Sequence, residues 1–140
     1  MSGADALNRA PLPLARLLGI VFREADRERV VAEMIVRADL CTAGERVHGG
    51  ALMAFADTAA ATGTAVSLPE GAAGTTTIES KTNFVSGAPL GATLIATATP
   101  VHRGRQTQVW QTRIETETGK LVAIVCQTQM IIYPRQASSP

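Results

Sequence analysis

The segment Val47-His-Gly-Gly-Ala-Leu-Met-Ala-Phe-Ala-Asp-Thr-Ala-Ala60 is the most informative part of this chain. Between Val47 and Pro69 the only side chain with a formal charge is that of Asp57. A helix that is apolar on nearly every face lies in a protein core, so this stretch predicts a long buried helix that begins just after His48. It is not interpreted as a membrane span, because it is poor in Leu, Ile and Phe and a central Asp costs about 2.5–3.5 kcal/mol on insertion. No membrane partner is expected.

Shorter segments on both sides of this helix have the patterns of other elements. Before it, we expect a short helix over 13–18, a strand over 20–24, an alternating strand over 30–38 and a loop over 41–47. After it, four strands are expected near 75–86, 92–102, 106–117 and 121–133, separated by turn residues. Their short connections predict that consecutive strands pair as antiparallel neighbours. The predicted fold class is α+β, with the long helix wrapped by a mostly antiparallel sheet of about five or six strands.

Length and charge limit the number of domains and the classes of partner. The 140 residues make one domain over 1–140, with loose ends expected at about 1–8 and 134–140. Thirteen basic and twelve acidic residues leave no concentrated basic surface, and few aromatic residues are available for stacking, so no nucleic acid partner is expected. The first residues show no basic stretch followed by an apolar run, so a cytoplasmic location is expected.

The cysteines and histidines carry no metal or redox signature. Cys41 and Cys126 match neither a zinc spacing nor C-x-x-C, so both are expected as buried free thiols. With two His residues, no H-x-x-x-H and no tight acidic cluster, no metal site is expected.

Asp57 and the start of the long helix are the candidate chemical groups. A carboxylate on a core helix needs solvent, a partner or a proton. Asp57 is therefore either a structural brace or a general base or nucleophile in a dry pocket. At the first helical turn, Gly49 and Gly50 have no side-chain bulk, and their free N–H groups either receive a developing oxyanion or serve a plain turn.

Spacing separates these two groups within one chain. Gly49 and Asp57 are eight residues apart, which is about 12 Å along a helix. One small reacting group cannot contact both, so a shared reaction needs Asp57 of one chain and Gly49 of another. A two-fold homodimer with antiparallel helices supplies that arrangement and creates two equal sites.

Several strings in the chain resemble one enzyme family. They are His48-Gly-Gly with an acid nine residues after the His, Thr75-Thr-Thr-Ile-Glu-Ser-Lys-Thr-Asn-Phe84, Pro100-Val-His-Arg-Gly-Arg-Gln-Thr-Gln-Val-Trp110, Gly119-Lys-Leu-Val-Ala123 and Gln127-Thr-Gln129. Over 14–132 the chain resembles the hotdog-fold acyl-CoA thioesterases, in particular the phenylacetate-pathway and Arthrobacter-type 4-hydroxybenzoyl-CoA branch. The resemblance implies a hotdog fold, a homodimer and often a homotetramer. It also implies hydrolysis of a small to medium acyl-CoA, aromatic or not, to free acid and CoA, with no cofactor because coenzyme A is part of the substrate.

The resemblance also assigns roles to residues by position. Asp57 would be the catalytic carboxylate, Gly49 of the partner chain would polarise the thioester carbonyl, and His48 would hold the thioester end or orient water. The residues implied to bind the substrate are Gly50, Thr42, Met53, Thr58, Ala61, Thr75, Thr76 and Thr77, with Phe55 also expected in the acyl pocket. The residues implied to meet the nucleotide end of coenzyme A are His102, Arg103, Gly104 and Arg105, of which Arg105 is the phosphate partner.

Two positions depart from the family pattern. Thr42 stands where relatives often carry Asn or Gln, and Ala61 stands where some carry Thr or Ser. These changes keep a second interpretation open, a non-catalytic module that binds acyl-CoA or an acyl carrier. A third is the hydratase or dehydratase chemistry of other hotdog proteins.

Overall fold

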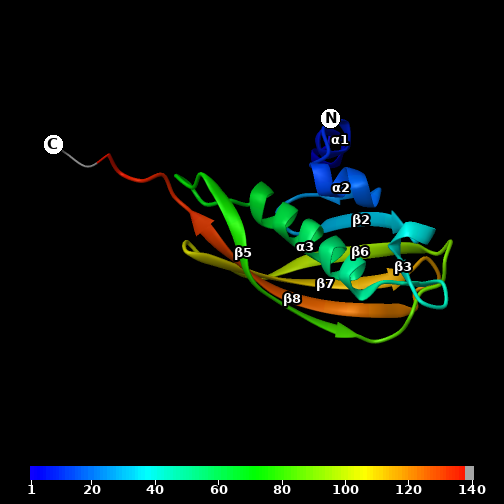
Figure 1. Ribbon diagram of the computed structural model, residues 1–140. Coiled ribbons are helices and arrows are strands. Elements are labelled where there is room, and N and C mark those ends of the chain that lie inside the picture. Colours follow the sequence, from blue (N-terminus) through cyan, green and yellow to red (C-terminus); the bar gives the residue numbers. More distant parts are fainter. Residues whose placement is uncertain (138–140) are drawn as a thin grey trace.

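The computed structural model describes residues 1–137, and it has one long helix lying across a curved sheet (Figure 1). The helices are α1 (Gly3–Arg9), α2 (Pro13–Leu18), the short 3-10 helix η1 (Ala38–Leu40) and α3 (Gly49–Val66). The strands are β1 (Val21–Ala25), β2 (Val30–Ile35), β3 (Cys41–Thr42), β4 (Arg46–Val47), β5 (Gly74–Phe84), β6 (Thr93–Arg103), β7 (Thr107–Thr116) and β8 (Leu121–Ile132). Six strands form one antiparallel sheet in the order β1-β2-β6-β7-β8-β5, and β3 pairs with β4 in a small hairpin. The predicted α+β class is confirmed.

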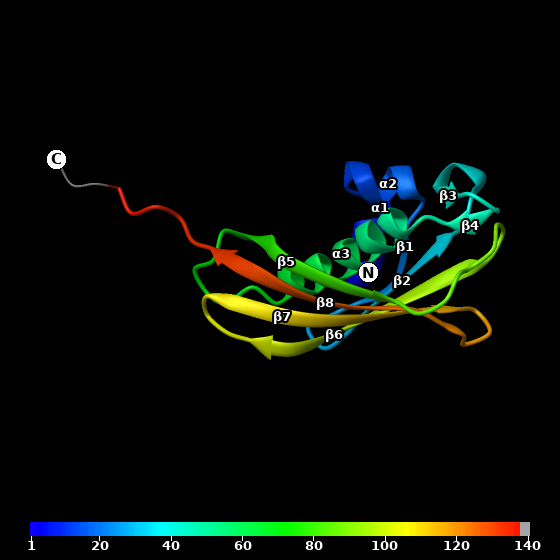
Figure 2. The same ribbon diagram turned by 60° about the horizontal axis from the view of Figure 1, so that its bottom comes forward.

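Helix α3 packs one face into the concave side of the sheet (Figure 2). On that face Phe55, Ala56, Ala59 and Ala60 have no exposed surface and belong to the same core as the inward side chains of the strands. Burial of apolar surface is the main stabilising contribution to such a fold. The prediction of a core helix that begins after His48 is confirmed. None of the helices in residues 1–137 has the length and apolar character that a membrane crossing requires.

Strand β5 lies at an edge of the sheet. Consecutive pairing predicts β5 beside β6, and this prediction is wrong, because β5 pairs with β8 from Gly74 opposite Ile132 to Phe84 opposite Ala123. The connection 85–92 allows this, since eight residues reach about 26 Å whereas three strand spacings are about 14 Å. Strands β6, β7 and β8 do follow one another as antiparallel neighbours. Within residues 1–137 the outer side of β5 has no strand partner.

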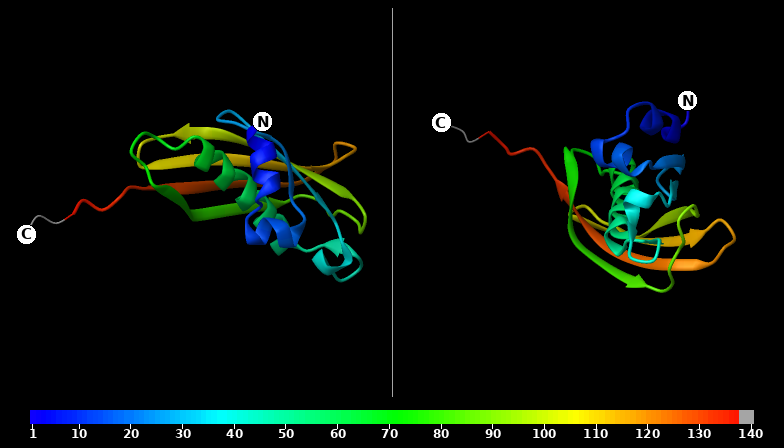
Figure 3. Two further views of the ribbon diagram at one scale, coloured as in Figure 1. Left: turned by 90° about the horizontal axis from the view of Figure 1, so that it is seen from above. Right: turned by 45° about the vertical axis from the view of Figure 1, so that its right-hand side comes forward.

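The N-terminal segment is folded, so the prediction of a loose end at 1–8 is wrong. Helix α1 begins with a capping box between Ser2 and Asp5, and the Ser2 backbone N–H holds the pKa of the Asp5 carboxyl below its ordinary value. Asn8 accepts from Phe22 N (2.9 Å) and donates to Phe22 O (2.8 Å), which ties α1 to β1. Helix α2 has the predicted bounds and ends at Gly19 with φ 70°. Both helices lie over α3 (Figure 3).

The remaining sequence predictions concern the C-terminus and the cysteines. Residues 134–137 have neither helix nor strand, and the rest of the predicted loose end, 138–140, lies outside the described residues. Cys41 and Cys126 are free, as predicted, and each is partly rather than fully buried.

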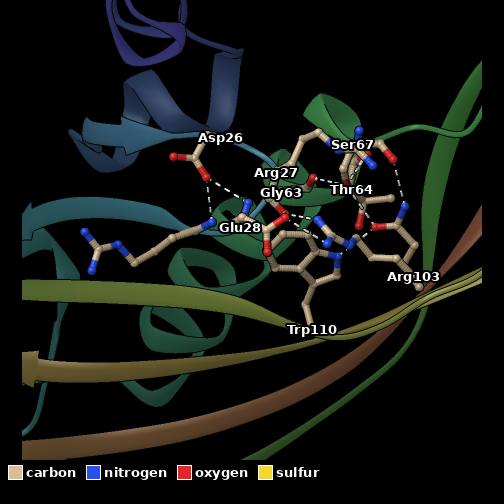
Figure 4. A network of polar contacts seen from close by, with 10 residues as sticks. Asp26, Arg27, Glu28, Gly63, Thr64, Ser67, Arg103 and Trp110 are labelled. Carbon is tan, nitrogen blue, oxygen red and sulfur yellow. Dashed lines mark hydrogen bonds and ion pairs between the residues drawn. The ribbon is translucent and has the colours of Figure 1, made fainter.

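The C-terminal half of α3 rests on the ring of Trp110 (Figure 4). A Cβ atom on Gly63 would lie 2.6 Å from two carbon atoms of that ring. The ring nitrogen of Trp110 donates to Gln108 Oε1 (2.9 Å), and Gln108 Nε2 donates to Ser67 O (3.1 Å). Ser67 Oγ donates to Gly63 O (2.7 Å). These buried bonds join the end of α3 to β7, and only glycine fits at position 63.

Gly63→Ala is expected to lower the free energy of unfolding by about 1–3 kcal/mol, because the added methyl group forces the helix or the Trp110 ring to move. Urea unfolding followed by circular dichroism measures the change. Gly74→Ala is the matched control, since a Cβ at that position meets nothing within 4 Å. Equal stability of the two variants would contradict close packing at Gly63.

Candidate active site

Asp57 is held by hydrogen bonds that join α3 to two strands. Its Oδ1 atom accepts from Thr77 Oγ1 of β5 (2.6 Å) and from Gln127 Nε2 of β8 (2.9 Å). Thr77 Oγ1 accepts in turn from Gln129 Nε2 (2.7 Å). Because that amide donates to the hydroxyl, the hydroxyl hydrogen of Thr77 is directed at Asp57. Two hydrogen-bond donors, Thr77 and Gln127, therefore fix the orientation of the carboxylate, which acts only as acceptor.

The two oxygens of Asp57 have different surroundings. Both hydrogen bonds end on Oδ1, and within residues 1–137 no donor contacts Oδ2. The side chain is half-buried and borders two depressions, of about 280 Å³ and about 390 Å³. Oδ2 is thus the oxygen that can act on a bound molecule, as a base or as a nucleophile.

Most of the predicted substrate-binding residues surround this carboxylate. Those that share a depression with Asp57 are Met53, Thr58, Ala61, Thr75 and Thr77. They come from α3 and β5, which run past each other at this point. The structure therefore brings together five of the residues that the family resemblance implied, and their role in binding a substrate stays a prediction.

Four predicted residues lie elsewhere, and one of them is Gly50, which borders a separate depression with His48. Thr76 is exposed, and the alternation of β5 directs its side chain to the face opposite that of Thr75 and Thr77. Thr42 is exposed on β3 and borders neither depression. Phe55 is fully buried in the core, so its prediction as a pocket residue is wrong. It lies two residues, or about 200° around the helix, from Asp57.

The start of α3 offers one unused backbone donor. His48 is the N-cap, and its Nδ1 accepts from Gly50 N (2.8 Å). The imidazole hydrogen is therefore on Nε2, and the Gly50 N–H is occupied rather than free. Within residues 1–137 the Gly49 N–H has no acceptor. Gly49 also faces Phe84, whose Cε1 would lie 3.1 Å from a Cβ placed on the glycine.

One chain does not bring Gly49 to Asp57. Gly49 borders a depression with Leu52 and Phe84, and this depression is separate from both that contain Asp57. The eight residues between them span about 12 Å of helix. Any reaction that uses both groups therefore needs a second copy of the chain.

The stretch implied to meet coenzyme A lies at the other end of α3, where β6 turns into β7. Arg103, Gly104 and Arg105 border a depression of about 260 Å³. His102 is exposed beside them, and a Cβ on Gly104 would lie 2.6 Å from His102 Nε2 and 3.0 Å from the backbone oxygen of Thr107. The guanidinium of Arg105 stacks over the Tyr133 ring, 5.3 Å from its centre.

Arg103 is tied to the turn between β1 and β2, as Figure 4 shows. It donates to Arg27 O and forms an ion pair with Glu28 (2.9 Å). The turn itself is closed by Asp26, which accepts from the backbone N–H groups of Glu28 and Arg29, and these bonds lower the pKa of Asp26. In the described part of the chain, no three His, Cys, Asp or Glu side chains gather as a metal ion would require.

The sequence predictions missed the two glutamines that orient Asp57. Gln127 and Gln129 are fully buried, and they lie between Val125 and Ile131 on the inward face of β8. Buried polar side chains need partners. Amide groups at inward positions of an otherwise apolar strand were therefore the signal that could have found them.

Comparison with known proteins identifies the family. Residues 44–123 match the family described as the thioesterase superfamily. The acyl-coenzyme A thioesterase PaaI of Escherichia coli is 34% identical over 110 residues, which cover 79% of this chain and 76% of that protein. The solved structure of E. coli PaaI has a TM-score of 0.83 at 28% identity, covering 92% of this chain and 91% of that one. A thioesterase structure from Haemophilus influenzae has a TM-score of 0.88 at 26% identity, covering 99% and 96%.

These similarities confirm the predicted hotdog fold. They also decide among the three interpretations of the sequence, because the relatives named are thioesterases rather than hydratases or binding modules. The matched residues include α3 with His48, Gly49 and Asp57. This chain belongs to the thioesterase superfamily and is a thioester hydrolase.

Proposed function

We propose that this chain hydrolyses acyl-CoA thioesters to a free acid and CoA, with Asp57 as the reacting carboxylate. The observation that carries the proposal is the difference between the two oxygens of Asp57. Thr77 and Gln127 both donate to Oδ1, whereas Oδ2 has no donor within the described residues, and the Asp57 side chain borders two depressions. The relative from E. coli that is 34% identical is an acyl-coenzyme A thioesterase, which supports CoA as the carrier of the acyl group.

Two routes begin at Oδ2 and give the same products. In the first, Oδ2 takes a proton from water, and the water oxygen attacks the carbonyl carbon. The carbon–sulfur bond then breaks, and the leaving thiolate receives the proton. In the second, Oδ2 attacks the carbonyl carbon, the thiolate leaves, and water cleaves the resulting anhydride. In both routes the carbonyl oxygen becomes negative, so a nearby backbone N–H lowers the barrier.

Gly49 of a second chain supplies that N–H in the proposed site. The N-terminus of α3 carries a partial positive charge, and the Gly49 N–H has no acceptor of its own within the described residues. His48 lies beside it with a hydrogen on Nε2, and this hydrogen can orient the thioester or a water molecule. Two antiparallel copies of α3 related by a two-fold axis place each Gly49 next to the Asp57 of the other chain.

The open edge of β5 supports this homodimer. Ile78, Phe84 and Val85 lie on or beside the strand and are between 54% and 55% exposed, and Met53 on α3 is 40% exposed. Exposed apolar side chains gathered in one region mark an interaction surface, and an unpaired strand edge is a template for pairing. Pairing of two β5 edges would run the two α3 helices antiparallel. Two such dimers would form the homotetramer that the resemblance implies.

The nucleotide end of coenzyme A is proposed to bind at the turn between β6 and β7. Arg27, Arg103 and Arg105 border the depression at this place. Glu28 positions Arg103, and Tyr133 supports the flat guanidinium of Arg105. A guanidinium binds phosphate through paired N–H donors, so three of them suit a ligand that carries several phosphates.

Release of free thiol from benzoyl-, phenylacetyl- and hexanoyl-CoA tests the proposed function. We expect hydrolysis of at least one of these, with a KM that rises with salt concentration because the arginines are partly exposed. The same acyl groups on an acyl carrier protein are expected to react more slowly, since the carrier lacks the nucleotide end. Hydrolysis from the carrier alone, or binding of CoA without thiol release, would contradict acyl-CoA hydrolysis.

A further inference from the structure

The larger depression beside Asp57 is bordered by α3 and by the N-terminal helices, and Figure 3 shows these helices lying over α3. On α3 it is bordered by Asp57, Ala61 and Ala65, which are spaced by four residues and so share one face. The opposite wall consists of Leu7, Leu12 and Leu14 from α1, α2 and the link between them. Its volume of about 390 Å³ lies in the range of about 300–1,000 Å³ that is usual for small-molecule sites.

The threonines in this depression use their hydroxyl hydrogens in hydrogen bonds within the protein. The Thr58 and Thr62 hydroxyls each donate to a carbonyl one helical turn earlier, at 2.8 Å. The Thr75 hydroxyl donates to Met130 O (3.1 Å). The described lining therefore holds one ionisable group, Asp57, and an otherwise apolar surface with no aromatic ring. Such a surface favours a hydrocarbon chain over a ligand that needs hydrogen bonds.

The length of the depression limits the length of that chain. From Asp57 to Ala65 the helix rises about 12 Å. A zigzag of carbon–carbon bonds of about 1.5 Å advances about 1.3 Å per carbon. An extended chain whose carbonyl carbon lies at Asp57 therefore reaches Ala65 with about eight to ten carbons.

The helices that border the depression lie outside the segment that matches the thioesterase superfamily. Helices α1 and α2 precede the matched residues 44–123. Ala15 and Leu18 anchor α2 in the core, whereas Leu12 is 71% exposed and lines the depression. The wall is thus fixed in place while its leucines remain available to a ligand.

We propose that the N-terminal helices and the Asp57–Ala65 face of α3 form an acyl pocket selective for unbranched aliphatic chains of about eight to ten carbons. This inference rests on the proposed function, because it places the thioester carbonyl at Asp57. The N-terminal leucines are specificity-determining residues in this pocket. A 4-hydroxybenzoyl group would bury its hydroxyl without a partner, so its kcat/KM is expected to be lower by about tenfold or more.

The test is a series of acyl-CoA substrates from butanoyl to hexadecanoyl, with 4-hydroxybenzoyl-CoA added. We expect kcat/KM to peak at octanoyl or decanoyl. Ala65→Leu fills the far end, so the ratio of kcat/KM for decanoyl to that for hexanoyl is expected to fall about tenfold or more. Position 65 is exposed, so the larger side chain does not disturb the core.

Leu12→Ser removes part of the wall, and Leu17→Ser is its matched control. Leu17 is 67% exposed, close to the 71% of Leu12, but it does not border the depression. Leu12→Ser is expected to raise KM for decanoyl-CoA about tenfold, whereas Leu17→Ser should have the wild-type chain-length profile. Calorimetric titration with sodium decanoate gives a second readout, in which Ala65→Leu and Leu12→Ser bind more weakly than wild type and Leu17→Ser.

The outcomes separate the pocket from the proposed function. If the wild type cleaves acyl-CoA and all three variants share its chain-length profile, the pocket is refuted while the proposed function stands. If no acyl-CoA is cleaved, the proposed function is refuted. Decanoate affinity then tests independently whether the acyl pocket exists. Equal decanoate affinity in wild type and Ala65→Leu would then overturn the pocket as well.

Discussion

Asp57→Asn is expected to lower kcat for acyl-CoA hydrolysis by about 10²–10⁴ and to change KM by less than about threefold. The asparagine oxygen still accepts from Thr77 and Gln127, which both donate to Oδ1 in the wild type. The fold and the substrate pocket therefore remain. What disappears is the charged Oδ2, which acts only as the transition state forms.

Steady-state kinetics of thiol release measures this change. Glu70→Gln is the control, since Glu70 is an exposed acid in the turn after α3 and has no hydrogen bond or ion pair within the described residues. It should keep the wild-type kcat. An Asp57→Asn variant that turns over as fast as wild type would remove Asp57 from the chemistry.

Gly49→Pro is expected to lower kcat by about 10²–10³ relative to Gly49→Ala, because proline has no N–H to offer the oxyanion. Proline is accepted at the first position of a helix, and the extended backbone of His48 is compatible with a following proline. Both substitutions add a Cβ near Phe84, so the alanine variant accounts for the steric effect. Equal kcat in the two variants would show that the Gly49 N–H has no catalytic role.

Mixing the two inactive variants then tests whether the site is shared between chains. In a mixed dimer, Asp57 of the Gly49→Pro chain meets Gly49 of the Asp57→Asn chain, so one of the two sites is intact. After subunit exchange in an equal mixture, half of the dimers are mixed, and about a quarter of wild-type activity returns. A site built within one chain would recover nothing.

Local patterns in the sequence predicted most of the elements, and long-range pairing explains the exceptions. The single charge between Val47 and Pro69 identified α3, and short turns identified β6, β7 and β8 as neighbours. The partner of β5 depends on where the connection 85–92 crosses, and no local pattern records this. The segment of helix α1 was predicted to be loose, because the two hydrogen bonds that hold it join Asn8 to Phe22, fourteen residues away.

The candidate site likewise contains some contacts that follow from local spacing and others that depend on long-range packing. Met53, Ala61 and Asp57 share a surface because helical spacing places them together, and that spacing is visible in the sequence. Gln127 reaches Asp57 across seventy residues of sequence, and only the register of β8 on β5 brings the two together. The contribution of the N-terminal leucines likewise depends on the packing of α1 and α2 over α3.

The unpaired edge of β5 also bears on how cells produce this enzyme. In a single chain, the eleven-residue strand β5 has free backbone groups at its outer edge that can nucleate aggregates. Under the proposed assembly, such a solitary chain also lacks the partner's Gly49 N–H, which would stabilise the negative carbonyl oxygen of the substrate. At a low concentration of the protein, single chains would therefore be inactive and open to binding by chaperones and proteases. Dimerisation would then both complete the active site and protect the chain from degradation.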